Sequence, residues 1–257
     1  MDDFETRFGG IARLYGKNGL QRLRAAHVCV VGIGGVGTWA AEALTRSGVG
    51  ALTLVDLDEV CVTNINRQLH ALTGTVGRAK VEVMAERIRA INPGCRVTAE
   101  QKFFNAQTSA ELLAPQFDFV LDAIDDVTNK VLLLARCREN HFPVVSCGGA
   151  GGRREVTSVR LGDLSKASHD KLLSEVRRRL RKEHPFPAGH SVMGVQCVYS
   201  VERTVFPQAD GSVCGMRPAA EDGTRLNCNG GLGSATFVTG AFGFAAAGLV
   251  VRTIAER

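Results

Sequence analysis

Residues 27–37 read HVCVVGIGGVG, and this stretch decides the fold. Its first five residues form a compact apolar run without polar alternation, which is typical of a strand buried on both faces of a parallel sheet. Helical spacing of apolar residues predicts a helix over residues 37–47, and Ala51–Val55 is a second apolar run. The first strand and the helix are joined by four glycines, Gly32, Gly34, Gly35 and Gly37. The pattern predicts a strand–helix–strand unit with a glycine-rich turn.

Strands and helices continue to alternate along the chain. Further strands are expected at 117–121, 143–147, 156–161 and 195–201, further helices at 79–91, 127–140, 170–182 and 235–251, and a short helix or loop at 21–27. This order predicts an α/β, Rossmann-like doubly wound, mostly parallel sheet with a C-terminal extension. We expect a single domain over residues 1–257, with a nucleotide-binding core in 1–152 and a part for substrate binding and dimerisation in 153–257.

The glycine-rich turn predicts a nucleotide site. Glycines between a strand and a helix let the backbone approach phosphate groups, and the helix N-terminus favours negative charge. Asp56, at the tip of the second expected strand, is the usual partner for ribose hydroxyls. Neither feature shows whether the site binds ATP, a nicotinamide cofactor or a flavin.

Residues 56–68 read DLDEVCVTNINRQ, and Lys80 follows at the start of the next expected helix. This segment resembles the signature of the ubiquitin-activating-enzyme-like adenylating superfamily, whose pattern also contains that lysine. An enzyme that splits ATP between the α and β phosphates needs cations for the developing charge, and Arg67 and Lys80 supply them. The resemblance implies that Asp58, Asn66, Arg67 and Lys80 bind the nucleotide, with Arg67 and Lys80 catalytic.

Two carboxylates follow the strand expected at 117–121, in the segment VLDAID (120–125). The resemblance implies that Asp125 lies beside the phosphates, takes part in catalysis and helps to hold Mg²⁺, which prefers oxygen ligands. Asp122 is expected to contact the nucleotide, although capping the following turn is an alternative role. Taken singly, Arg67 also fits a surface ion pair; the joint pattern favours adenylation of a carboxylate.

Segments spread over nearly the whole chain are similar to the tRNA threonylcarbamoyladenosine dehydratases of that superfamily: RFGGIARLYG (7–16), AAEAL (40–44), CVTNINR (61–67), GGAGG (148–152) and FPQ (206–208). The resemblance implies an ATP- and Mg²⁺-dependent cyclisation of threonylcarbamoyladenosine in tRNA, with loss of water, by a homodimer. The alternative is an adenylyltransferase acting on the C-terminus of a sulfur-carrier or ubiquitin-like protein. A nicotinamide oxidoreductase and a non-catalytic nucleotide-fold module are disfavoured by Arg67, Lys80 and Asp125. Whether a sulfur-relay protein docks stays open.

Many relatives carry an early arginine that reaches the ATP of the partner subunit. The matching position of this chain is Gly10. Arg7 and Arg13 are therefore two alternatives for that role, and the absence of such an arginine is the third.

The net charge of +5 permits a tRNA partner without requiring one. In the helix expected at 170–182 the apolar positions form one stripe, which leaves the basic side chains outward. Candidates for tRNA contact are Arg153, Arg154, Arg177, Arg178, Arg181 and Lys182. A solvated charged surface is an equal interpretation. Residues 183–193 are expected to form a lid or a plain connector.

The eight cysteines show no C-x-x-C spacing of a zinc site, and most fit small buried residues of a reducing cytosol. A thioester-forming cysteine at Cys197, Cys214 or Cys228 stays a minor alternative. Residues 1–10 lack the apolar core of a signal peptide, so we expect a cytoplasmic protein. The apolar run 235–251 contains three glycines and two threonines and is expected to be a buried helix, with a membrane-associated tail as the alternative.

Overall fold

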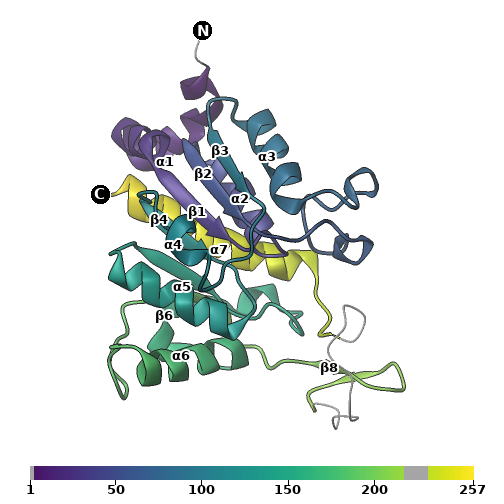
Figure 1. Ribbon diagram of the computed structural model, residues 1–257. Coiled ribbons are helices and arrows are strands. Elements are labelled where there is room, and N and C mark those ends of the chain that lie inside the picture. The colour runs from purple at the N-terminus through teal and green to yellow at the C-terminus, as the bar shows by residue number, and fades with distance from the viewer. Residues whose placement is uncertain (1–2, 217–230) are drawn as a thin grey trace.

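The computed structural model describes residues 3–216 and 231–257, and most of them belong to one layered α/β unit (Figure 1). A seven-stranded sheet has the order β3-β2-β1-β4-β5-β7-β6, in which only β6 runs antiparallel to its neighbour. Its strands are β1 (His27–Val31), β2 (Ala51–Val55), β3 (Arg96–Glu100), β4 (Phe119–Asp122), β5 (Val144–Cys147), β6 (Val159–Asp163) and β7 (Gln196–Ser200). The strands β8 (Phe206–Pro207) and β9 (Val213–Cys214) pair separately as a small hairpin.

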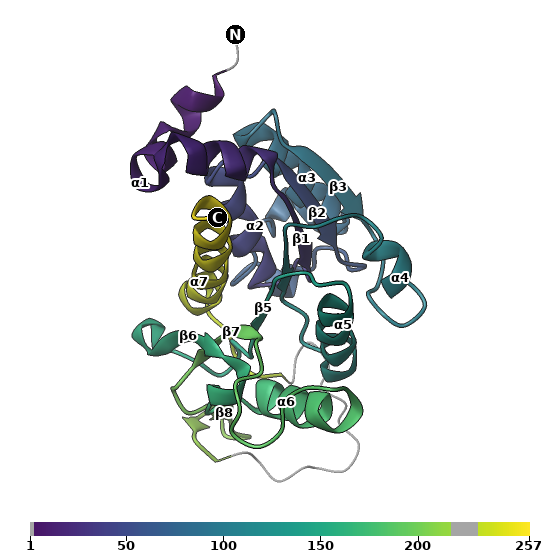
Figure 2. The same cartoon turned by 90° about the vertical axis from the view of Figure 1, so that its left-hand side faces the viewer.

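Helices cover both faces of the sheet (Figure 2). They are α1 (Phe4–Ala25), α2 (Gly37–Arg46), α3 (Lys80–Ile91), α4 (Ser109–Leu112), α5 (Val127–Glu139), α6 (Lys171–Glu183) and α7 (Thr236–Ala255). Side chains of α2, α3 and α7 share one hydrophobic core, whereas α4 and α5 contribute to the core on the other face. The prediction of a doubly wound, mostly parallel sheet is confirmed.

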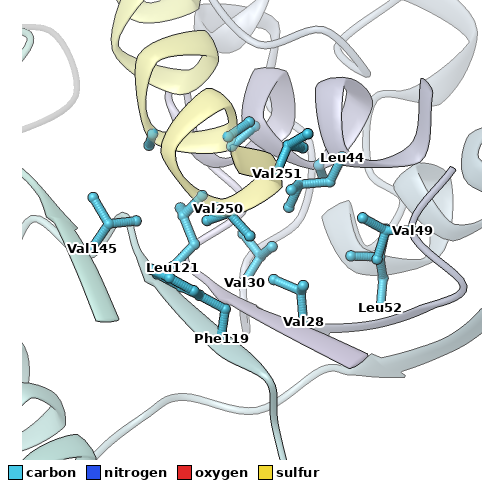
Figure 3. Packing of buried hydrophobic residues seen from close by; sticks show 14 of the residues in the cluster. Val28, Val30, Leu44, Val49, Leu52, Phe119, Leu121, Val145, Val250 and Val251 are labelled. Carbon is cyan, nitrogen blue, oxygen red and sulfur yellow. The ribbon is translucent and has the colours of Figure 1, made fainter. Parts of the chain in front are cut away.

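Strand β1 shows how the sequence produces the two layers. Alternate residues of a strand point to opposite faces, so Val28 and Val30 pack toward α2 and α7 (Figure 3), while Cys29 and Val31 join the core beside α5. All four residues are at most 2% exposed. Burying each valine contributes roughly 1.5–3 kcal/mol, which explains why the run has no polar alternation.

Helix α7 is a core helix packed closely against α2. A Cβ atom on Gly243 would lie 2.6 Å from the carbonyl oxygen of Val36, so glycine is required for this approach. Among the described residues α7 is the one helix long and apolar enough to cross a membrane, but 61% of its apolar window is buried inside the protein. The buried-helix interpretation of residues 235–251 therefore fits the structure.

Among the elements that differ from the expectations, three have a clear cause in the sequence. The short helix or loop at 21–27 is the end of a 22-residue segment, α1, which is interrupted by non-helical backbone at Gly16; its glycines conceal the helical spacing of its buried residues. Residues 156–158 form a 3₁₀ turn, so β6 starts later than predicted. Strand β3 was missed because its sequence, RVTAE, carries little apolar signal at the sheet edge.

Candidate active site

The glycine-rich turn lies at the point where the strand order reverses, between β1 and β4. Gly32 follows β1 with a φ of +91°, and a Cβ atom there would lie 2.8 Å from the Ala123 carbonyl oxygen beyond β4. A Cβ atom on Gly37 would collide with the Gly32 carbonyl oxygen at 1.8 Å. These glycines are needed for the chain to turn tightly from β1 into α2, which leaves a crevice at the carboxyl ends of the strands.

Asp56 ends β2 and holds the glycine-rich turn. Its carboxylate accepts hydrogen bonds from the backbone N–H groups of Ile33, at 2.6 Å, and Asp58, at 2.9 Å. Burial raises the pKa of Asp56, and the nearby charge of Lys80 opposes that rise. The carboxylate thus connects β2 to the turn and remains beside the crevice.

Lys80 is the first residue of α3 and is 5% exposed. Its Nζ donates to Asp58 Oδ2 at 2.7 Å, and its backbone N–H donates to the Asp58 carbonyl oxygen at 3.0 Å. The ammonium group is therefore fixed at the crevice by a partner that is itself largely solvated, since the Asp58 side chain is 69% exposed. Such a fixed cation can stabilise phosphate charge without reorganising.

Arg67 is held through both its side chain and its backbone carbonyl oxygen. Its Nη1 donates to the Thr63 carbonyl oxygen at 2.7 Å and to Asn66 Oδ1 at 3.1 Å. Its carbonyl oxygen accepts the indole N–H of Trp39, at 3.1 Å, and the hydroxyl of Thr239, at 3.2 Å. Trp39 lies on α2 and Thr239 on α7, so two helices fix the backbone of this arginine.

Asn66 adds a second connection to the start of α7. Its Nδ2 donates to the Ser234 carbonyl oxygen at 2.8 Å, and its own carbonyl oxygen accepts the Thr236 hydroxyl. In Figure 1 this end of α7 meets the loop that follows β2. The segment 62–68 therefore spans from the nucleotide motif to the C-terminal helix.

A cavity of about 860 Å³ collects most of the predicted residues. Those that line it are Gly32, Gly34, Gly35, Asp56, Asp58, Asn66, Arg67, Lys80 and Asp125. Leu57 and Phe103, each 50% exposed, add apolar surface on the nucleotide side. The other side is formed by residues 147–151, Leu172 and residues 231–234.

Asp122 does not line this cavity, and the expectation that it contacts the nucleotide is corrected by its surroundings. Its carboxylate is fully buried, 2.8 Å from Lys130 Nζ, and accepts the Ser146 hydroxyl at 2.7 Å. It also accepts the Ile124 N–H at 3.0 Å, while Lys130 Nζ donates to the Ile124 carbonyl oxygen at 2.7 Å. The pair thus supports the turn that presents Asp125. Gly37 also lies outside the lining and serves the turn itself.

Residues 10–256 match the sequence profile of the ThiF family. The chain belongs to the ThiF family. The matched residues contain the whole sheet, all of the helices except the start of α1, and every cavity residue named above.

Comparisons with individual proteins place this ThiF-family chain among the dehydratases. It is 51% identical to the tRNA threonylcarbamoyladenosine dehydratase of Escherichia coli K12, over 95% of this chain and 92% of the relative. The solved E. coli TcdA, a tRNA N6-threonylcarbamoyladenosine dehydratase in complex with ATP, superposes with a TM-score of 0.87 at 45% identity, covering 99% of this chain and 96% of that one. The E. coli molybdopterin-synthase adenylyltransferase is 37% identical over 56% of this chain and 57% of its own. The predicted resemblance to the dehydratases is confirmed.

The donor set of this ThiF-family site fits a magnesium ion that binds together with phosphates. Asp125 is exposed at the cavity, and within residues 3–216 and 231–257 its carboxylate has no hydrogen-bond or ion-pair partner. In the same described part, no cluster of three or more His, Cys, Asp or Glu side chains forms a self-sufficient metal site. Magnesium commonly binds through one or two carboxylates plus phosphate oxygens, which is the arrangement that Asp125 allows.

The candidate tRNA-contact residues separate into two groups. Arg153 is 4% exposed and donates to the His169 carbonyl oxygen, so this candidate is buried rather than available at the surface. Arg177 donates to the carbonyl oxygens of Leu164 and Ala167, and Arg181 donates to that of Pro187. Both side chains are partly buried and stabilise the neighbouring loops. Arg154, Arg178 and Lys182 are exposed, although Arg178 pairs with Glu175.

Two buried cysteines, Cys147 and Cys197, are poor nucleophiles. Cys147 lines the cavity, but burial raises the pKa of its thiol to about 12. Burial also raises the pKa of Cys197 to about 12. Cys214 lies on β9 and does not line the cavity, and the third thioester candidate, Cys228, lies outside the described residues.

Proposed function

We propose that this chain catalyses the ATP-dependent cyclisation of threonylcarbamoyladenosine in tRNA, with loss of water, through adenylation of the substrate carboxylate. The observation that carries the proposal is the convergence of Arg67, Lys80 and Asp125 on one cavity beside the glycine-rich turn. The similarity to the E. coli dehydratase over 95% of the chain supports the substrate class.

In the proposed reaction the phosphates of ATP lie along the glycine-rich turn and Asp56 holds the ribose. The substrate carboxylate attacks the α-phosphate, and pyrophosphate leaves past Arg67 and Lys80, whose fixed charges stabilise the transition state. A nucleophile within the same modified nucleoside then displaces AMP and closes a ring. The second step needs no enzyme nucleophile, which agrees with the raised pKa of Cys147.

Magnesium is part of this proposal as the ion that Asp125 would hold. When bound, it would neutralise phosphate charge during the transfer. Asp58 is not an equivalent second ligand, because its carboxylate is paired with Lys80 at 2.7 Å.

The alternative function, adenylation of a sulfur-carrier or ubiquitin-like C-terminus, uses the same nucleotide chemistry. Its representative, the molybdopterin-synthase adenylyltransferase, matches only 56% of this chain. The longer and closer match to the dehydratase therefore favours the first proposal.

We further propose that the protein acts as a cytoplasmic homodimer. Phe237 and Phe244 on α7 are 58% and 50% exposed, and Leu14 on the adjoining α1 is 75% exposed. Such apolar surface is typical of an interface. If a partner subunit supplies an arginine, Arg13 is favoured over Arg7, because Arg7 is paired with Asp3 at 2.7 Å, whereas Arg13 is exposed and has no polar partner among the described residues.

The test uses bulk tRNA that carries threonylcarbamoyladenosine. The tRNA is incubated with the protein, ATP and magnesium, digested, and its nucleosides are weighed by mass spectrometry. We expect loss of one water with the wild-type protein and none with Arg67→Ala or Asp125→Ala. An unchanged nucleoside, combined with pyrophosphate exchange that depends on a small protein ending in Gly-Gly, would establish the alternative function.

A further inference from the structure

Three chain segments meet at the substrate side of the cavity. The N–H of Gly152 donates to the Gly233 carbonyl oxygen at 2.7 Å, and its carbonyl oxygen accepts the Val205 N–H at 3.0 Å. Gly152 has a φ of +69°, and a Cβ atom there would lie 2.5 Å from Thr204 Cγ2. Only glycine allows this approach, so the segment 203–206 lies directly beside the glycine loop 148–152, most of which lines the cavity.

This junction brings cations from three segments together. Arg154 lies two residues after Gly152, and Arg203 lies two residues before Val205; both are exposed, and neither guanidinium group has a polar partner among the described residues. Lys171 immediately precedes Leu172, which lines the cavity, and its Nζ lies 5.5 Å from the ring centroid of Phe206 on β8. Figure 2 shows β8 beside α6. We name Arg154, Lys171, Arg203 and Phe206 the cationic rim.

The acidic side chains of this region are already engaged by backbone N–H groups. Glu202 accepts the N–H groups of Arg154 and Glu155, and Asp170 accepts those of Gly149 and Leu173. Glu155 accepts the N–H and the hydroxyl of Thr157. Because these carboxylates stabilise the loops, the side-chain donors of the rim remain available to an external anion.

We propose that the cationic rim binds the single-stranded RNA that flanks the target nucleotide. Arg154, Lys171 and Arg203 contact phosphates on either side of it, and Phe206 offers an aromatic face to a flanking base. Single-stranded RNA is commonly held by this combination of cations and aromatic rings. This inference rests on the proposed tRNA substrate, and it moves the RNA contact away from Arg153, Arg177 and Arg181 on the grounds of their burial.

The test measures the affinity of the full-length protein for tRNA as a function of salt, in the wild type and in Arg154→Gln, Lys171→Gln and Arg203→Gln. Each loss of a phosphate contact should lower the slope of log K against log salt by about 0.7 in magnitude. Phe206→Leu should weaken binding about tenfold and leave the slope unchanged, since stacking involves no charge. Lys17→Gln is the matched control, because it removes an exposed lysine on α1 that is neither part of the rim nor a candidate for tRNA contact.

The outcomes separate this inference from the proposed function. Unchanged slopes in the three rim variants, or an equal decrease in Lys17→Gln, would overturn the rim. A wild-type protein that binds no tRNA but adenylates a Gly-Gly protein would overturn both the rim and the dehydratase proposal. If tRNA is bound but not converted, the dehydratase proposal fails while the slopes still decide the rim. An unchanged KM for ATP in every variant confirms that the nucleotide side is intact.

Discussion

The nucleotide side and the substrate side of the cavity belong to one sheet but have walls of different chemistry. On the nucleotide side, charged side chains are fixed by short hydrogen bonds, as in the contacts of Lys80 with Asp58 and of Asp56 with Ile33. On the substrate side, the lining from residues 148–151 and 231–233 consists of glycines together with Ala150 and Leu232, so it carries no charged side chain. We infer that the first side supplies charge stabilisation and the second supplies shape, and the proposed rim would add the charge that a polyanionic substrate requires.

The largest effect is expected from removing the buried Lys130–Asp122 ion pair, which supports the turn before Asp125 on the nucleotide side. Lys130→Met leaves the fully buried carboxylate of Asp122 without its cation, so the free energy of unfolding should fall by about 3–5 kcal/mol in denaturant titrations. The double variant Lys130→Met, Asp122→Leu should regain much of that stability, because the uncompensated charge is gone. A single variant as stable as the wild type would show that the pair does not support the turn before Asp125.

The next effect separates two lysines that line the same cavity. Lys80→Ala should lower the turnover number by about 10²–10³-fold, as removal of a fixed charge-stabilising donor does in other enzymes. Lys102→Ala is the control, because Lys102 is already neutralised by Glu100 and Glu111 at 3.1 Å and 2.5 Å. Steady-state release of pyrophosphate measures both variants. Equal losses would mean that the cavity needs only general positive charge.

A third effect concerns the stability of the nucleotide side at acidic pH. His70 is 2% exposed; burial, with a smaller contribution from the charge of Lys80, lowers the pKa of its imidazole to about 4. An unfolded histidine titrates near 6.5, so below that pH the unfolded state binds a proton more readily than the folded state does. The stability contributed by neutral His70 is therefore complete above about pH 6.5 and is lost toward pH 4, by roughly 3 kcal/mol. The free energy of unfolding of His70→Gln, measured across this window, should fall less steeply than that of the wild type; parallel curves would refute the assignment.

Most of the candidate residues of the nucleotide side line one cavity, and sequence patterns could select them together because the motifs that carry them are local. The residues of the turn and of the segment 56–68 are adjacent in sequence, and hydrophobic runs placed them at strand ends. Asp122 was misassigned because its partner Lys130 lies on α5 and looks like an ordinary helical lysine in the sequence. The burial of Arg153 could not be predicted from the sequence either, because it depends on packing against the segment that contains His169. Trp39 and Thr239 were missed for the same reason: their shared partner, the Arg67 carbonyl oxygen, leaves no sequence signal.

The smallest expected effect concerns how Arg67, on the nucleotide side, is held by helix α2. Trp39 is the only tryptophan of the chain, it lies outside the cavity lining, and its indole N–H donates to the carbonyl oxygen of Arg67. Trp39→Phe removes that donor and keeps an aromatic ring opposite Phe244, whose centroid lies 5.8 Å away. The Thr239 hydroxyl still satisfies the carbonyl oxygen, so the cost in folding should stay near 1 kcal/mol.

We expect Trp39→Phe to lower kcat about fivefold, because a net hydrogen bond of about 1 kcal/mol no longer orients the proposed phosphate-binding arginine. Phe244→Leu is the matched control: it removes the ring contact and leaves the indole hydrogen bond in place. Turnover should therefore change in the first variant and not in the second. A loss of kcat in Phe244→Leu alone would instead locate the coupling at the exposed face of α7, where the proposed partner subunit packs, and would make dimerisation rather than the indole the determinant of how Arg67 is positioned.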